Sequence, residues 1–104
     1  MRYVMNAAVI TNPGTFRYRT INLEEAKELL SNQTFISAVG HEGTAAVASQ
    51  LTGFNVAYNR QQVTMNKGDD AVVFKPKVRL PEGQILDSRQ LLEMLEIGWL
   101  ERVE

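Results

Sequence analysis

The sequence contains no cysteine and a single histidine, His41, among its 104 residues. Without cysteine the chain forms no disulfide and offers no thiolate to a metal ion, which fits a reducing compartment such as the cytoplasm. One histidine also excludes a multi-histidine zinc site within one copy of the chain. We therefore expect neither of these two kinds of metal centre, and the sequence gives no sign of a cofactor site.

Long apolar runs are also missing. The first residues, MRYVMNAAVITNPG, lack the apolar stretch of a signal peptide or a membrane span, so we expect a cytoplasmic protein with no membrane attachment. The formal net charge is −1, with 11 Lys and Arg against 12 Asp and Glu. This balance argues against a surface that binds duplex nucleic acid stably. Five basic residues between positions 60 and 79 still allow a local phosphate site.

Apolar residues make up 44% of the chain, which is enough for one packed core. No repeat, linker or low-complexity segment divides the sequence, and we expect a single domain over residues 1–104. Small domains often gain stability by pairing with a second copy, so a homodimer is expected.

Short β-rich segments alternate with helical patterns along the chain. Asn22 and Glu25 form a capping box at the start of one helix, and Gly53 suits the end of another. The loop NKGDD predicts a hairpin between residues 62–65 and 71–78. The other expected strands are residues 3–9, 16–21, 34–39 and 99–103, and the other helices are 44–51 and 88–96. The mixture predicts an α/β or α+β fold, with a single mixed sheet of about five strands flanked by helices.

His41 stands where a β-rich segment passes into a helix, in SAVGHEGTAAVASQL. The start of a helix presents free backbone N–H groups and the positive end of the helix dipole, and both favour a phosphate. A histidine there can hold or release a proton near neutral pH. The structural alternative is a helix-start histidine that only satisfies backbone groups.

Arg79 and Glu82 form a second group, in VRLPEG. An arginine can bind two phosphate oxygens, and a carboxylate three residues later can accept a hydrogen bond from a ribose hydroxyl. A solvated ion pair is the structural alternative. Arg60, in YNRQQV, is by itself typical of a surface residue, whereas Asn6 lies inside an apolar strand and must find hydrogen-bond partners there.

The same residues carry a resemblance to a known family. SAVGHEGTAAVASQLTG, YNRQQVTMNKGDDAVVF and VRLPEGQIL resemble small proteins of archaeal viruses, phages and integrative elements. That family includes the anti-CRISPR ring nucleases, which destroy cyclic tetra-adenylate, the second messenger of type III CRISPR systems. The resemblance runs from about Ser37 to the C-terminus, with MNAAV as a weaker match near the start.

The resemblance implies a homodimer that binds cyclic tetra-adenylate across its two-fold axis and cuts it without metal. His41 matches the proposed general acid, Arg79 contacts the phosphate that is cut, and Glu82 contacts the attacking 2′-hydroxyl. Asn6 and Arg60 match residues that hold the ligand, and we add Thr44 and Lys75 as candidate ligand-binding residues. The expected product is linear di-adenylate with a 2′,3′-cyclic phosphate.

Two departures from the family pattern are present. The segment AAVITNPGTF after Asn6 is less polar than in related proteins, and His41-Glu42-Gly43 replaces a more common His-Asp-Ser. Both affect ligand contacts and therefore ring-size preference. Two other functions stay open from the sequence: a module that sequesters the cyclic nucleotide without cutting it, and an accessory factor of a mobile element that binds DNA or protein.

Overall fold

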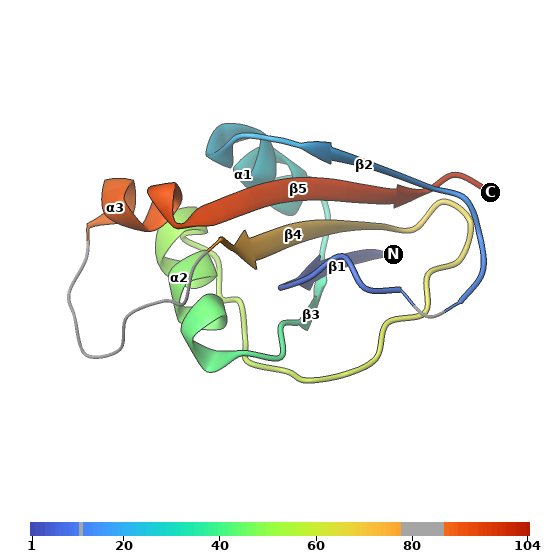
Figure 1. The fold of residues 1–104 in the computed structure, drawn as a ribbon, viewed down its shortest axis with the longest axis horizontal. Helices are drawn as coiled ribbons and strands as arrows, with labels where there is room; N and C mark the ends of the chain where they lie inside the picture. Colours follow the sequence, from blue (N-terminus) through green and yellow to red (C-terminus); the bar gives the residue numbers. More distant parts are fainter. Residues whose placement is uncertain (11, 78–86) are drawn as a thin grey trace.

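The computed structural model describes residues 1–10, 12–77 and 87–104, which form one five-stranded sheet and three helices (Figure 1). The strands are β1 (Arg2–Met5), β2 (Phe16–Thr20), β3 (Ile36–Ala38), β4 (Asp70–Pro76) and β5 (Leu95–Arg102), in the order β2-β5-β4-β1-β3. The helices are α1 (Leu23–Asn32), α2 (Glu42–Thr52) and α3 (Ser88–Glu93). The expected fold class is confirmed, and the homodimer stays a prediction.

Four of the five strands run in one direction. β1 pairs in parallel with both β3 and β4, whereas β5 is antiparallel to β4 and to β2. The carboxyl ends of β1, β3 and β4, at Met5, Ala38 and Pro76, therefore meet at one edge of the sheet, which we call the carboxyl edge. In sheets with parallel strands, this edge is where ligands usually bind.

The sheet has two different faces. α1 and α2 lie on the far face in Figure 1, where a core cluster that includes Val4, Val72 and Phe74 packs against them. On the near, helix-free face, a smaller cluster includes Met5, Val73 and Leu100. Side chains alternate between the faces along each strand. Within the described ranges, none of the helices is long and apolar enough to cross a membrane.

The local signals for helix ends are confirmed. The Asn22 side chain accepts a hydrogen bond from the Glu25 N–H, and the Glu25 side chain accepts one from the Asn22 N–H, so the capping box at the start of α1 is complete. Gly53 ends α2 with a left-handed φ of 78°. α2 begins two residues earlier than the expected helix, because His41 takes the N-cap position.

The expected strand at residues 62–65 is wrong. This segment forms no ladder with β4, which pairs instead with β1 and β5. Val63 and Met65 alternate inward because they cover the helix-free face, so their β-like pattern reports burial rather than strand pairing. A turn follows, in which the Asp69 N–H donates to the Asn66 carbonyl (2.9 Å).

Other boundaries also differ from the sequence expectations. The first strand ends at Met5 instead of residue 9. α3 ends at Glu93, so the expected helix over 88–96 is too long, and β5 begins at Leu95 rather than at residue 99. The early start of β5 places its first residues beside the carboxyl edge.

A buried ion pair joins three strands. Asp70 accepts hydrogen bonds from Arg2 Nε (2.9 Å) and Nη2 (2.7 Å) and from Trp99 Nε1 (2.9 Å). The Arg2 and Asp70 side chains are each 11% exposed. Arg2 also donates to the Leu29 carbonyl, so one guanidinium connects β1 and β4 to α1.

Tyr18 lies across β5 on the helix-free face. A Cβ atom at Gly98 would overlap the tyrosine ring, so the glycine makes room for it. The Tyr18 hydroxyl donates to Glu96 Oε2 (3.0 Å). Partial burial against β5, the hydrogen bond to Glu96 and the negative charge of Glu96 together raise the pKa of Tyr18, which is 39% exposed, from 10.0 to about 12.

The raised pKa of Tyr18 gives a pH prediction. Because the folded-state pKa lies above the unfolded one, the stabilisation is fully present below pH 10 and is lost as the pH rises through about 12. Subtracting the near-ultraviolet phenolate titration of Tyr18→Phe from that of the parent protein should isolate this late ionisation. A difference curve centred near 10 would contradict the assignment.

Candidate active site

His41 is the N-cap of α2. Its Nδ1 atom accepts a hydrogen bond from the Thr44 N–H (3.2 Å) and lies 3.3 Å from the Thr44 hydroxyl oxygen. The Thr44 side chain is 0% exposed, whereas His41 is exposed. We assigned Thr44 to ligand binding from the sequence; in the structure its side chain lies behind the imidazole and contacts it.

The hydrogen bond from the Thr44 N–H defines which tautomer the neutral imidazole adopts. A nitrogen that accepts from an N–H carries a lone pair, so the neutral ring has its proton on Nε2. To donate a proton from Nε2 and end as the neutral ring, the imidazole must start as imidazolium. Nδ1 then carries a proton of its own and cannot accept the hydrogen bond from the Thr44 N–H. The Thr44 hydroxyl oxygen is then the nearby acceptor for Nδ1–H.

Asn6 and Gly40 connect the ends of two parallel strands. Asn6 follows β1, and its Oδ1 atom accepts a hydrogen bond from the Gly40 N–H (3.2 Å), just before His41. The polar amide that was unexpected in an apolar segment therefore has a described partner. Its position ties the residue before His41 to the central strand of the parallel group.

Arg60 lies against the same turn. The Asn59 N–H donates to the Val39 carbonyl (2.9 Å), which brings the following residue beside the end of β3. A Cβ atom at Gly40 would come within 3.2 Å of Arg60 Cγ, so the glycine permits the close approach. The structure therefore brings Asn6, Gly40, His41 and Arg60 together.

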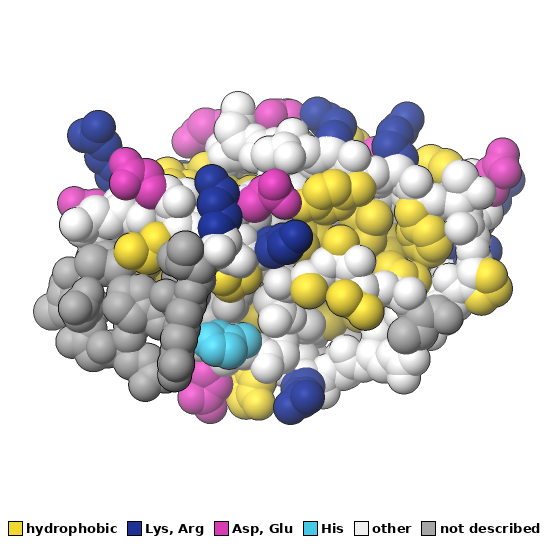
Figure 2. Space-filling view, in the orientation of Figure 1, with side chains coloured by type: hydrophobic (Ala, Val, Ile, Leu, Met, Phe, Trp, Pro, Cys, Tyr) yellow, Lys and Arg dark blue, Asp and Glu magenta, His cyan; other side chains and the backbone are white. Residues whose placement is uncertain are grey.

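Two lysines add positive charge near the carboxyl edge. Lys75 is exposed and shares the helix-free face with Val73, while Lys77 follows the end of β4. Figure 2 shows the single histidine at this surface, with Lys or Arg side chains above and below it. Within the described part of the chain, the ion pairs involve Met1, Arg2, Arg17 and Arg19 and leave Arg60, Lys75 and Lys77 for other partners.

Arg79 and Glu82 lie outside the described residues, in the segment 78–86 that follows Lys77 in the chain. Their assignments stay predictions. Within residues 1–10, 12–77 and 87–104, no group of three or more His, Asp or Glu side chains is placed to hold a metal ion.

Sequence reasoning missed Lys77 and the start of β5 as parts of this edge. Lys77 was counted only as one basic residue in a run, and Leu95 was expected inside a helix. The signal was weak because both positions depend on strand pairing: the Lys77 N–H donates to the Met94 carbonyl (2.8 Å), and Leu95 faces Pro76.

Comparison with known proteins places the chain in a family. The model of the STIV B116-like family matches residues 2–99, which is most of the chain. The protein belongs to the STIV B116-like family. A solved structure with this fold, B116 of Sulfolobus turreted icosahedral virus, superposes with a TM-score of 0.82 at 25% identity, covering 97% of this chain and 98% of that one.

Three relatives are similar to this chain over most of their own length. Uncharacterized protein 26 of Sulfolobus islandicus filamentous virus is 36% identical, with 96% of this chain and 89% of the relative covered. ORF117 of Acidianus two-tailed virus is 34% identical, with 98% and 93% covered. YddF of Bacillus subtilis is 32% identical, with 84% and 82% covered. The relatives thus include proteins of archaeal viruses and of a bacterium, and the resemblance to small viral proteins is confirmed at that level.

Proposed function

We propose that the protein is a metal-independent ring nuclease that cuts cyclic tetra-adenylate and thereby antagonises type III CRISPR immunity in the cytoplasm of a host cell. The observation that carries the proposal is the placement of an exposed histidine at the start of α2, beside Arg60 and a turn held by Asn6. Backbone N–H groups at a helix start favour a phosphodiester, and Arg60, whose Cβ and Cγ lie against Gly40 of the same turn, adds an arginine to this surface.

The chemistry follows from the roles assigned to the residues. The ribose 2′-hydroxyl attacks the adjacent phosphorus and forms the 2′,3′-cyclic phosphate, while Glu82 accepts the hydroxyl proton. Arg79 stabilises the charge that develops on the phosphoryl oxygens. The bond from phosphorus to the 5′-oxygen breaks as His41 donates a proton to that oxygen.

A two-fold arrangement explains how a chain of net charge −1 binds a tetra-anion. Each protomer contributes Arg60 and Arg79, so a homodimer presents four guanidinium groups to four phosphates. Each protomer then cuts one bond, and the two cuts give two molecules of linear di-adenylate. The positive charge is local, and it requires no basic character of the whole surface.

The direct test is incubation of the protein with radiolabelled cyclic oligoadenylates of several ring sizes in EDTA, followed by chromatography. We expect cyclic tetra-adenylate to be converted to di-adenylate with a 2′,3′-cyclic phosphate, with no loss of rate on adding EDTA. Binding without cleavage would favour sequestration, and loss of cleavage in EDTA would require a metal-dependent mechanism. Retention of DNA with no effect of cyclic adenylates would instead favour an accessory DNA-binding factor.

A further inference from the structure

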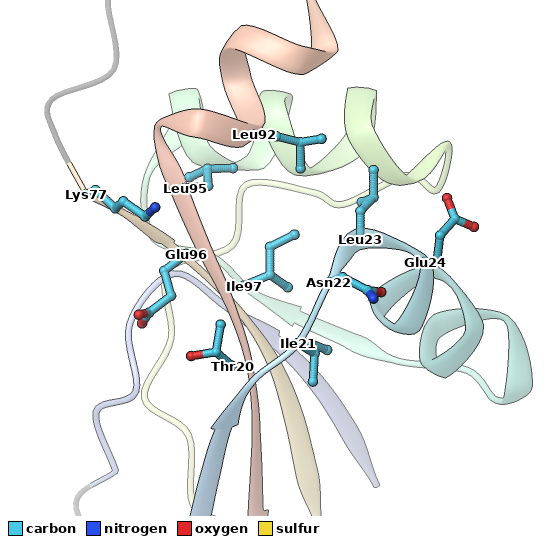
Figure 3. Close-up of a pocket in the computed structure, with 10 residues that line it drawn as sticks. All are labelled: Thr20, Ile21, Asn22, Leu23, Glu24, Lys77, Leu92, Leu95, Glu96 and Ile97. Atoms are coloured by element: carbon cyan, nitrogen blue, oxygen red, sulfur yellow. The ribbon is translucent and has the colours of Figure 1, made fainter.

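A cavity of about 560 Å³ opens at the carboxyl edge on the β5 side of the sheet. We call it the β5-edge cavity, and its apolar wall is formed by five side chains, Ile21, Leu23, Leu92, Leu95 and Ile97. Figure 3 shows Leu23, Leu92 and Ile97 pointing toward the space between β5, α1 and α3. Thr20, Asn22, Glu24, Lys77 and Glu96 form its polar rim.

The cavity exists because β2 leaves β5 early. β2 ends at Thr20, opposite Gly98, and the Ile21 N–H makes one more bond, to the Ile97 carbonyl (2.9 Å). The chain then turns into α1 at Asn22. The first residues of β5 therefore extend beyond their neighbour, and their outer edge faces the cavity.

That outer edge carries two backbone groups that can hydrogen-bond to a ligand, the N–H and the C=O of Leu95. In an antiparallel strand, alternate residues direct their N–H and C=O groups to the same side. Since the Ile97 carbonyl points toward β2, the N–H and C=O of Leu95 point the same way, where β2 no longer runs. Within the described residues no partner on that side bonds to them.

These features match an adenine base. Apolar walls with a small number of placed polar groups are typical of ligand pockets. An N–H beside a C=O matches N1, which accepts, and the 6-amino group, which donates, on the Watson–Crick edge of adenine. Lys77, whose amine points into the region near Leu95 in Figure 3, supplies a cation for an attached phosphate.

The position also fits a ligand that reaches His41. β5 and β3 are separated by β4 and β1, and three strand spacings amount to about 14 Å. A single nucleotide does not span this distance, whereas a ring of linked nucleotides does. One base of such a ring would then lie far from the bond being cut.

We infer that the β5-edge cavity is a base subsite that binds an adenine of the cyclic oligonucleotide through the Leu95 backbone. The inference rests on the proposed function, because the occupant is the proposed substrate. Its role is binding rather than chemistry, so its loss raises KM and leaves kcat near the parent value.

The test compares two threonines that line cavities of similar size. Thr20 is exposed at the β5-edge cavity, and Thr34 is exposed at a cavity of about 530 Å³ lined by Leu30, Ser31, Gln33, Phe35 and Phe54. We expect Thr20→Trp to raise KM for cyclic tetra-adenylate by about ten-fold, the order of one lost base contact. Thr34→Trp should change the KM for cyclic tetra-adenylate by less than about two-fold, because surface substitutions away from a site have small effects.

A ligand change checks the hydrogen bonds. A cyclic tetranucleotide with purine in place of adenine lacks the 6-amino group, and we expect it to bind the parent about ten-fold more weakly, since the Leu95 carbonyl loses its donor. The Thr20→Trp variant should bind the adenine and the purine cyclic tetranucleotides with about equal affinity. Equal KM values for both threonine variants, with an active parent, would overturn the subsite alone. A parent that neither binds nor cuts cyclic tetra-adenylate would overturn the proposed function and the subsite with it.

Discussion

Replacing His41 with asparagine is expected to slow cleavage of cyclic tetra-adenylate by about 10²- to 10⁴-fold while the ligand still binds, because the variant lacks the proposed general acid. Asparagine is among the preferred N-cap residues, and its side-chain oxygen can accept from the Thr44 N–H as Nδ1 does now. Single-turnover rates and ligand affinity, measured at saturating protein, separate the two effects.

His41→Ala provides the matched control for folding. Alanine removes both the acid and the cap, and loss of an N-cap costs about 0.5–2 kcal/mol. We expect both variants to be equally slow, but only the alanine variant to have a lower free energy of unfolding. Cleavage by His41→Asn at the parent rate would refute the role of the imidazole as the acid.

The second large effect concerns stability. Asp70→Asn should lower the free energy of unfolding by about 3 kcal/mol, because it leaves the buried Arg2 guanidinium without its counter-charge. For a domain of this size each kcal/mol shifts Tm by about 4–8 °C. Thermal unfolding should therefore show a fall in Tm of about 12–24 °C.

A matched control lies directly opposite on the neighbouring strand. Glu101 pairs with Asp70 in register and forms a surface ion pair with Arg17 (3.0 Å), whose side chain is 63% exposed. Glu101→Gln removes the same kind of charge from an exposed pair and should cost less than about 1 kcal/mol. Similar Tm values for the two variants would show that the buried position of the Arg2–Asp70 pair does not increase its contribution to stability.

The sequence predicted best the features that depend on neighbouring residues. The capping box of Asn22 and Glu25 and the glycine end of α2 were correct because each involves only one turn of chain. Strand partners were harder to predict. Residues 62–65 carry a β-like pattern and lie next to a turn, but nothing local shows that β4 pairs with β1 and β5 instead.

In the candidate site, too, local features could be predicted from the sequence, whereas features that depend on strand partners could not. The turn from β3 into α2 at His41 could be expected from Gly40 and the residues after it. The hydrogen bond between Asn6 and Gly40 could not, because it depends on β1 and β3 being parallel neighbours. The family resemblance brought Asn6, His41 and Arg60 into one site, whereas the open edge of β5 needed the register of β2 to be known.

His41 combines an observed role, as the N-cap of α2, with a proposed one, as the general acid, and the two roles favour different residues at this position. Histidine is not among the residues that cap helices best, and asparagine, aspartate and serine all do so better. Selection for thermal tolerance alone would favour one of these at position 41, and each would remove the imidazole. Under the proposed function, histidine at this position gives up part of the stability of the first turn of α2 for the imidazole that acts as the acid, which is a stability–activity trade-off located in one side chain.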